Sequence, residues 1–234
     1  MGLFSRRRDE EEPERVEAAP EEPPHSGRGA SRGPWDVEEV PDLGPRVDLG
    51  ALRVPGRQGM QLRIEMDPSG ERPIAVNLAL GSSALQVQAF AAPRTSGIWD
   101  ELRSEIAMSV TRQGGTADEA AGPFGTELLA RLPVRTPEGR TGHRPTRFLG
   151  VDGPRWFLRG VLSGEAAVKA EAASELEEAF ADIVVVRGLE ARPPRALLPV
   201  QLPELPGQER GKAGAAQDAS LEVLRRGPEI TETR

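Results

Sequence analysis

Three consecutive segments alternate strictly between apolar and polar side chains, and this pattern constrains the fold more than any other feature. Residues 60–66 read MQLRIEM, residues 73–80 read PIAVNLAL and residues 84–90 read ALQVQAF. A period of two places alternate side chains on opposite faces of a β-strand. Each segment therefore predicts a strand with one buried and one solvated face. The turn residues DPSG at 67–70 and the short connections favour an antiparallel meander.

Two later segments change to a helical period. In residues 96–115 apolar side chains recur every four positions, which predicts a helix with one apolar stripe that Trp99 flanks, Ser96 as its cap and Gly114-Gly115 as its end. Residues 163–182 predict a second helix with an apolar stripe of its own. The inward-facing residues are expected to be Ile98, Leu102, Ile106 and Val110 in the first helix, and Val168, Ala172, Leu176 and Phe180 in the second.

The remaining apolar runs predict more strands. Residues 124–134 (FGTELLARLPV) form one, and residues 147–160 (RFLGVDGPRWFLRG) predict a hairpin turning at Asp152-Gly153. The β-branched run IVVVRG at 183–188 predicts a buried central strand, and residues 192–204 predict an extended, proline-rich strap. This order predicts an α+β fold in which a mainly antiparallel sheet of about six to eight strands packs against two helices.

Composition divides the chain into a central region and two polar ends. Residues 9–24 read DEEEPERVEAAPEEPP, with eight acids and four prolines, and such a segment cannot offset the entropy of ordering itself. We expect a disordered acidic tail over 1–34, a single α+β domain over 35–206 and a low-complexity tail over 207–234. No apolar run is long enough to span a membrane and the start MGLFSRRR lacks an apolar signal region, so a cytoplasmic location is expected.

Several kinds of chemistry lack their residues. The chain has no cysteine, which excludes disulfides, thiolate chemistry and Cys-ligated metal sites. The motifs GxxxxGK[ST], strand-led GxGxxG, HExxH and GxSxG are absent. Nucleophile–base catalysis would depend on His143, near Thr136, Thr141, Thr146 and Glu138. A lone loop histidine is more often solvated, so we expect a non-enzymatic protein with no catalytic residue, no cofactor and no metal.

Arginine gathers around the predicted hairpin. From residue 131 to residue 159 there are seven arginines and two acids. Alternation in the second hairpin strand places Arg155, Phe157 and Arg159 on one face, where guanidinium groups could contact carboxylate or phosphate and Phe157 would add a flat apolar surface. The candidate binding residues are Arg140, Arg144, Arg147, Arg155, Phe157 and Arg159.

Three interpretations of this basic face stay open. The helix over 165–182 carries six acids and one lysine, so it could neutralise the arginines. Basic and aromatic side chains on a sheet also fit nucleic acid or phosphate, although the net charge of −7 opposes tight non-specific binding to nucleic acid. The third interpretation is a protein-docking face. We expect a non-catalytic binding or scaffolding module with an unknown protein partner, with a nucleic-acid- or phosphate-binding protein as the alternative and a cryptic hydrolase as the second alternative.

Three stretches follow the acidic head in a fixed order: GVDGPRWFLRGVLSG at 150–164, VVVRG at 184–188 and PPRALLPVQLP at 193–203. With them the chain resembles, over roughly Trp35–Pro206, an uncharacterised family of actinobacterial proteins known only as a domain of unknown function. Members are often encoded near a deoxyuridine triphosphatase gene, so the resemblance implies a tilt toward nucleotide or genome upkeep. It assigns no catalytic residue.

Overall fold

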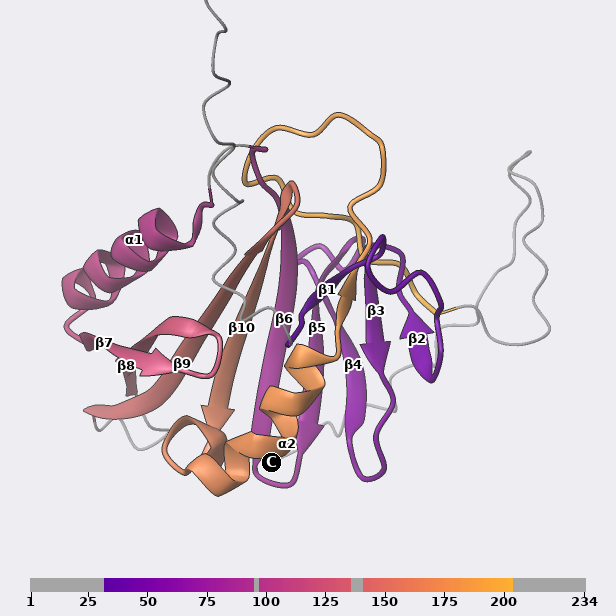
Figure 1. Cartoon of the computed structure of the whole chain (residues 1–234). Coiled ribbons are helices and arrows are strands. Elements are labelled where there is room, and N and C mark those ends of the chain that lie inside the picture. Colours follow the sequence, from indigo (N-terminus) through magenta and orange to yellow (C-terminus); the bar gives the residue numbers. More distant parts are fainter. Residues whose placement is uncertain (1–31, 95–96, 136–140, 204–234) are drawn as a thin grey trace, which may run out of the picture. The chain divides into compact units, whose positions relative to one another are not determined.

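The computed structural model describes residues 32–94, 97–135 and 141–203 (Figure 1). The helical elements are α1 (Trp99–Arg112), the short 3-10 helix η1 (Glu165–Ala167) and α2 (Ala170–Ala181). The strands are β1 (Trp35–Asp36), β2 (Arg46–Asp48), β3 (Leu52–Pro55), β4 (Gln61–Met66), β5 (Pro73–Leu80), β6 (Ser83–Ala91), β7 (Thr116–Gly122), β8 (Gly125–Arg135), β9 (Thr141–Gly153), β10 (Trp156–Gly164) and β11 (Val184–Val185).

Seven strands form the main sheet, in the order β4-β5-β6-β10-β9-β8-β7, and every neighbouring pair is antiparallel. The period of two in the sequence sets its faces, because residues of β6 alternate between buried and half-buried along the whole strand. The predicted α+β fold, with a mainly antiparallel sheet and two helices, is confirmed. The strands expected over 60–66, 73–80 and 84–90 are β4, β5 and β6.

A second, four-stranded sheet has the order β1-β11-β3-β2, with β1 parallel to β11. The prediction of a central strand over 183–188 is corrected here. Only Val184 and Val185 form a strand, and they lie between β1 and β3 in this small sheet. The β-branched run indicates burial, which both valines show, but a pattern within one segment does not specify which sheet it joins.

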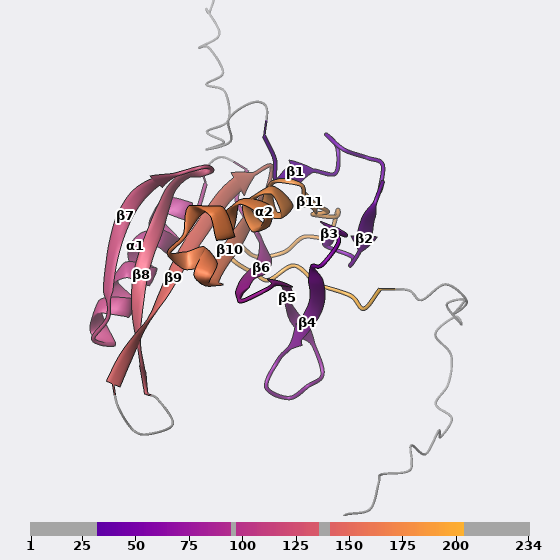
Figure 2. The same cartoon turned by 90° about the horizontal axis from the view of Figure 1, so that it is seen from below.

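The small sheet and α2 cover the same face of the main sheet (Figure 2). Leu176 and Phe180 of α2 are fully buried, as predicted. The ring of Phe180 lies over Gly160 of β10, where an added Cβ would come within 2.8 Å of the ring. Val168 was expected to face inward, yet it is 64% exposed, because α2 begins only at Ala170 and Val168 lies in the connection after η1.

Helix α1 packs on the opposite face of the main sheet, over β7, β8 and β9 (Figure 1). Trp99, the first residue of α1, is buried beside Ile98. The expected cap Ser96 lies outside the described residues. The observed cap comes from Asp152 of β9, whose carboxylate accepts hydrogen bonds from the backbone N–H groups of Ile98 (2.8 Å) and Trp99 (3.2 Å).

This role of Asp152 shifts the hairpin turn. Gly153 pairs with Trp156, so the two turn residues are Pro154 and Arg155 instead of Asp152 and Gly153. Arg155 takes a positive φ of 61°, a conformation that costs a residue with a Cβ about 1–2 kcal/mol. The Asp-Gly signal locates the hairpin, but long-range capping of α1 engages the aspartate and moves the turn by two residues.

The predicted strap runs from Arg192 to the end of the described region at Pro203. Its backbone pairs with β6, because the N–H of Leu198 donates to the backbone oxygen of Ala89 over 2.8 Å. It then passes beside the small sheet, where the N–H of Gln201 donates to the backbone oxygen of Leu49 over 2.9 Å. The strap therefore joins the two sheets. Most of the expected tails, and the expected domain end at 206, lie outside the described residues.

Candidate anion-binding site

One part of the main sheet carries no helix from the described residues. On one side of the sheet, helix α1 covers β7, β8 and β9 and, through Trp99, the part of β10 at Phe157. The rest of β10 and the same side of β4, β5 and β6 extend past the helix. Cross-strand pairs on this side include Arg159 with Gln88, Gln86 with Asn77, and Asn77 with Arg63. We call this region the open sheet face; its polar residues are Gln61, Arg63, Glu65, Asn77, Gln86, Gln88, Arg159 and Ser163, all exposed or half-buried.

Arg159 is the cation at the centre of the open sheet face. Its side chain is half-buried, and its Nη2 donates a hydrogen bond to Oε1 of Gln88. Its guanidinium lies 5.7 Å from the ring centroid of Phe90. The buried Nε has no acceptor and the guanidinium has no carboxylate partner among the described residues. Burial alone lowers the pKa of Arg159, since desolvation disfavours a charge without a counter-ion.

Neighbouring amides hold this arrangement in place. Nε2 of Gln88 donates to the backbone oxygen of Ile74 over 3.0 Å, which leaves Oε1 of Gln88 directed at Arg159. The carboxylate of Glu65 on the same face accepts a hydrogen bond from Gln86. The site thus presents a positioned guanidinium while the nearby acid on its face is bonded to an amide.

An aromatic cluster forms the boundary between α1 and the open sheet face. Phe157 stacks on Trp99 at 5.7 Å and tilts against Phe90 at 6.1 Å. Phe157 is fully buried, which corrects its expected role as an accessible flat surface: α1 covers it. Phe90 lies beside Arg159 in its place. The sequence signal for Phe90 was present, because alternation in ALQVQAF places it on the same face as Gln86 and Gln88.

Arg147 lies on the opposite face of the sheet and pairs with two carboxylates through its Nη2, while its buried Nε has no acceptor among the described residues. It contacts Glu127 at 2.9 Å and Glu177 of α2 at 2.8 Å, with 13% of its side chain exposed. Burial opposes its charge, but the two glutamates outweigh this and raise the pKa of Arg147. The interpretation that the acidic helix neutralises the basic hairpin therefore describes Arg147, and not Arg159.

The other candidate residues are dispersed. Arg155 lies at the hairpin tip, and Arg144 is exposed on β9. Arg144 is six residues from Gly150, the β9 partner of Arg159, which places it about 20 Å away along the strand. Arg140 lies outside the described residues. The five described candidates therefore do not form one surface, and the binding roles of all six stay predictions.

His143 is exposed on β9 and makes no hydrogen bond or ion pair with the described residues. Thr146 is buried with no partner for its hydroxyl there, while Thr136 and Glu138 lie outside the described ranges. Within those ranges no three His, Asp or Glu side chains gather as metal ligands would. Neither α1 nor α2 is long and apolar enough to cross a bilayer.

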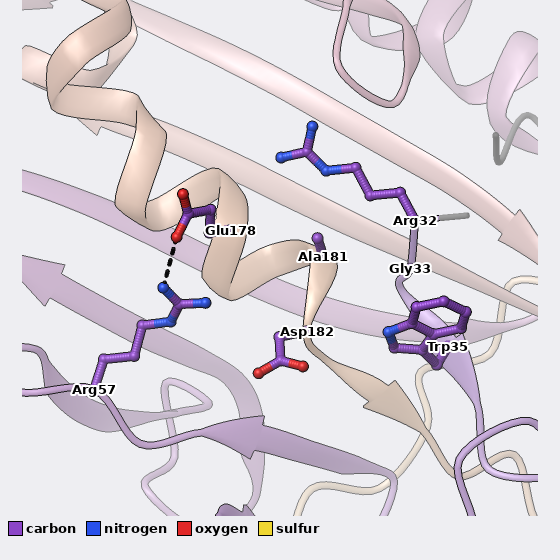
Figure 3. Close-up of a pocket in the computed structure, with 7 residues that line it drawn as sticks. All are labelled: Arg32, Gly33, Trp35, Arg57, Glu178, Ala181 and Asp182. Carbon is purple, nitrogen blue, oxygen red and sulfur yellow. Dashed lines mark hydrogen bonds and ion pairs between the residues drawn. The ribbon is translucent and has the colours of Figure 1, made fainter. Parts of the chain in front are cut away.

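A pocket of about 270 Å³ lies at the end of α2 (Figure 3). Its two acids are both paired, Glu178 with Arg57 at 2.8 Å and Asp182 with Arg46 at 2.6 Å. Figure 3 shows Arg32 on the other side of the helix from Arg57, and Arg32 lies 5.2 Å from the ring of Phe124. Because the charged side chains at this pocket largely neutralise one another, an ionic ligand is less favoured here than at Arg159.

A family model described as "Protein of unknown function (DUF3710)" matches residues 33–209. The chain belongs to the DUF3710 family. The match spans the whole open sheet face and both helices, and it confirms the resemblance to a domain-of-unknown-function family. The actinobacterial origin and the gene neighbourhood stay expectations. Comparison with curated proteins gives no match.

Proposed function

We propose that this DUF3710 protein is a non-catalytic binding module that takes a carboxylate of a partner protein at Arg159. The observation that carries the proposal is the half-buried guanidinium of Arg159, which has Gln88 and Phe90 as neighbours and no carboxylate among the described residues. A desolvated cation without a counter-ion is unfavourable. An incoming anion would relieve that cost, which gives the site a physical reason to bind.

The setting makes Arg159 a stronger anion site than an ordinary surface arginine. An exposed ion pair contributes about 0–1 kcal/mol because water screens it. Hydrogen bonds to charged groups that are shielded from water contribute about 1.5–3 kcal/mol each. The side chain is also held by Gln88 and packed on Phe90, so less side-chain entropy is lost on binding.

The rest of the open sheet face suits a polypeptide. Asn77, Gln86 and Gln88 carry both donors and acceptors, the complement of backbone N–H and C=O groups. One central cation flanked by amides matches a single carboxylate on an extended chain better than a row of phosphates. The net charge of −7 also disfavours polyanions at a distance.

Single-stranded nucleic acid is the second candidate. One observation favours it: half-buried Phe90 and Phe148 share a face of the main sheet with Arg144 and Arg159, and rings beside arginines can stack bases. Both rings also pack against the cluster of Trp99 and Phe157 beneath α1, which reduces the ring surface left for a base.

Binding titrations of the full chain separate the candidates. The probes are an extended, end-capped peptide that carries a single glutamate among serines and threonines, and a thymidine dodecamer, both titrated by calorimetry at about 50 mM salt, where screening is weak. We expect the peptide to bind, and Arg159→Gln to weaken it at least about tenfold, which is 1.4 kcal/mol. Arg131→Gln is the matched control, because Arg131 is an exposed arginine on the opposite face of the sheet.

Each outcome has a consequence. Equal peptide affinity in Arg159→Gln and Arg131→Gln, or no peptide binding by the wild type, overturns the proposal. A dodecamer that binds more tightly than the peptide and depends on Arg159 replaces it with the second candidate. Arg159→Lys keeps the charge, so it should retain part of the affinity even if the glutamine variant folds poorly.

A further inference from the structure

A second cationic cluster lies at the tip of the sheet, where β9 turns into β10 and the loop after β11 passes. We call Arg155, Arg187 and Arg192 the tip arginines. Nε of Arg187 donates to the backbone oxygen of Arg155 over 3.1 Å, and Nη1 of Arg187 donates to that of Glu190 over 3.0 Å. These bonds use backbone acceptors, so they fix the guanidinium of Arg187 between the backbones of Arg155 and Glu190 without neutralising its charge.

The cluster is short of negative charge. Arg192 pairs with Glu190 at 2.5 Å, and no other ion pair to a tip arginine occurs within the described ranges. Three cations with one carboxylate leave a net charge of +2. Burial lowers the pKa of Arg187, and the charges of Arg155 and Arg192 lower it further. Mutual repulsion is therefore part of the folded structure.

A neighbouring arginine shows the contrast. Arg195 lies in the same strap and also has a positive φ, of 66°. It pairs with Glu101 at 2.7 Å and Glu105 at 3.0 Å, both from α1. Among the residues that the structure describes, two acids pair with Arg195, whereas only Glu190 pairs with a tip arginine. Leu189, which lies between Arg187 and Arg192 in the sequence, is 97% exposed. The cluster therefore also offers an apolar contact.

The chain enters the fold beside this cluster. Asp36 of β1 accepts a hydrogen bond of 2.6 Å from the indole of Trp156, the residue after Arg155. Val37 N–H donates to Val185 over 3.1 Å, two residues before Arg187. Residues 9–22 hold eight acids and one arginine, and the ten residues from Glu22 to Arg32 can span about 33 Å when extended. The acids therefore reach the tip easily.

We propose that the acidic head, residues 9–22, docks on the tip arginines of its own chain. Carboxylates of the head pair with Arg155, Arg187 and Arg192, and Val16 supplies an apolar side chain for Leu189. Tethering raises the local concentration of the head to the millimolar range, so pairs that are individually weak suffice. The contact masks a positive surface that any external acidic partner would otherwise meet, and it is separate from the site at Arg159.

The absence of cysteine in the natural chain permits a clean distance measurement. Spin labels are placed on the full chain at Ala18→Cys in the head and Ala191→Cys beside Arg192, with Ser174→Cys on the exposed side of α2 as the reference site. At about 50 mM salt we expect a short, narrow 18–191 distance that lengthens and broadens near 500 mM, where the Debye length falls below about 5 Å. The 18–174 distance should stay longer.

Charge variants test the assignment. Arg155→Gly, Arg187→Gln and Arg192→Gln together should abolish the short 18–191 distance; glycine is used at 155 because φ is positive there. The control triple Arg72→Gln, Arg112→Gln and Arg131→Gln removes the same charge from exposed positions elsewhere and should leave the short distance in place. An 18–191 distance unaffected by the tip triple, or equally lost in the control triple, overturns the proposal.

Two further measurements keep the result specific. Tenfold dilution of the labelled chain with unlabelled chain must preserve the short distance, and its loss means that the head binds a second copy and contradicts docking within one chain. Arg159→Gln should leave the distance unchanged. Failure of head docking is therefore distinguishable from failure of carboxylate binding at Arg159.

Discussion

Arg147 donates a hydrogen bond of 2.8 Å to Glu177, and this ion pair joins β9 to α2. The same guanidinium group contacts Glu127 of β8 at 2.9 Å, so one side chain connects two neighbouring strands to the helix above them. Arg147 therefore has a structural role that its neighbour in the candidate set, Arg159, does not share.

Replacing Arg147 should destabilise the fold strongly. Arg147→Met leaves two carboxylates without a counter-ion, one with 8% and one with 16% of its side chain exposed, and breaking a buried pair in this way costs about 3–5 kcal/mol. Urea denaturation gives the change in the free energy of unfolding. Arg131→Met on the exposed surface of β8 should change it by less than about 0.5 kcal/mol. Equal effects of the two substitutions contradict a structural role for Arg147.

Capping of α1 by Asp152 gives a second prediction. Asp152→Ala removes the acceptor for the N–H groups of Ile98 and Trp99 and should lower the free energy of unfolding by about 0.5–2 kcal/mol. Gly97→Ala should act in the same direction, because its Cβ would lie 2.4 Å from Oδ2 of Asp152. Asp118→Ala on exposed β7 is the control. A stability unchanged by Asp152→Ala rules out this cap.

The pH dependence of that cap follows from its burial. Burial raises the pKa of Asp152 above 3.8, although the N–H groups of Ile98 and Trp99 oppose the shift. A carboxyl group whose folded pKa exceeds its unfolded value binds its proton more tightly in the folded state, so its contribution to stability grows as pH falls through the folded pKa. As pH is lowered from 7, the free energy of unfolding of the wild type should therefore rise relative to that of Asp152→Asn. A pH-independent difference contradicts this direction.

The turn at Arg155 is predicted to prefer glycine. With φ at 61°, Arg155→Gly relieves the contact between Cβ and backbone and should raise the free energy of unfolding by about 0.5–1 kcal/mol relative to Arg155→Ala, which keeps a Cβ. Thermal unfolding of the two variants makes the comparison. A glycine variant less stable than the alanine variant would show that the positive φ is not a source of strain.

Local periodicity explains how much of the fold the sequence predicts. Strict alternation in β4, β5 and β6 specifies both the strands and their faces, and spacing of four specifies the buried stripe of α1. Each of these patterns lies within one segment. Errors occurred where a distant segment decides the outcome: Asp152 caps α1 instead of turning the hairpin, and Val184 and Val185 join the small sheet because β1 and β3 lie beside them.

The candidate site shows the same division. Alternation placed Phe157 and Arg159 on one face, and they do share it. Where α1 comes to rest could not be predicted from the hairpin, yet it decides that Phe157 is buried while Arg159 stays half-exposed. Phe90 was missed because it lies on β6, outside the arginine-rich segment, although its ring centroid lies 5.7 Å from the guanidinium of Arg159.

The central claim is that Arg159 serves binding and not folding. Thermal unfolding of wild type and Arg159→Met, with and without the single-glutamate peptide, tests it most directly. An unpaired desolvated cation costs stability, so Arg159→Met should melt at or above the wild-type temperature without peptide, and the peptide should raise the melting temperature of the wild type alone. A loss of several kcal/mol in Arg159→Met, comparable to that of Arg147→Met, or an equal effect of the peptide on both proteins, would contradict the claim.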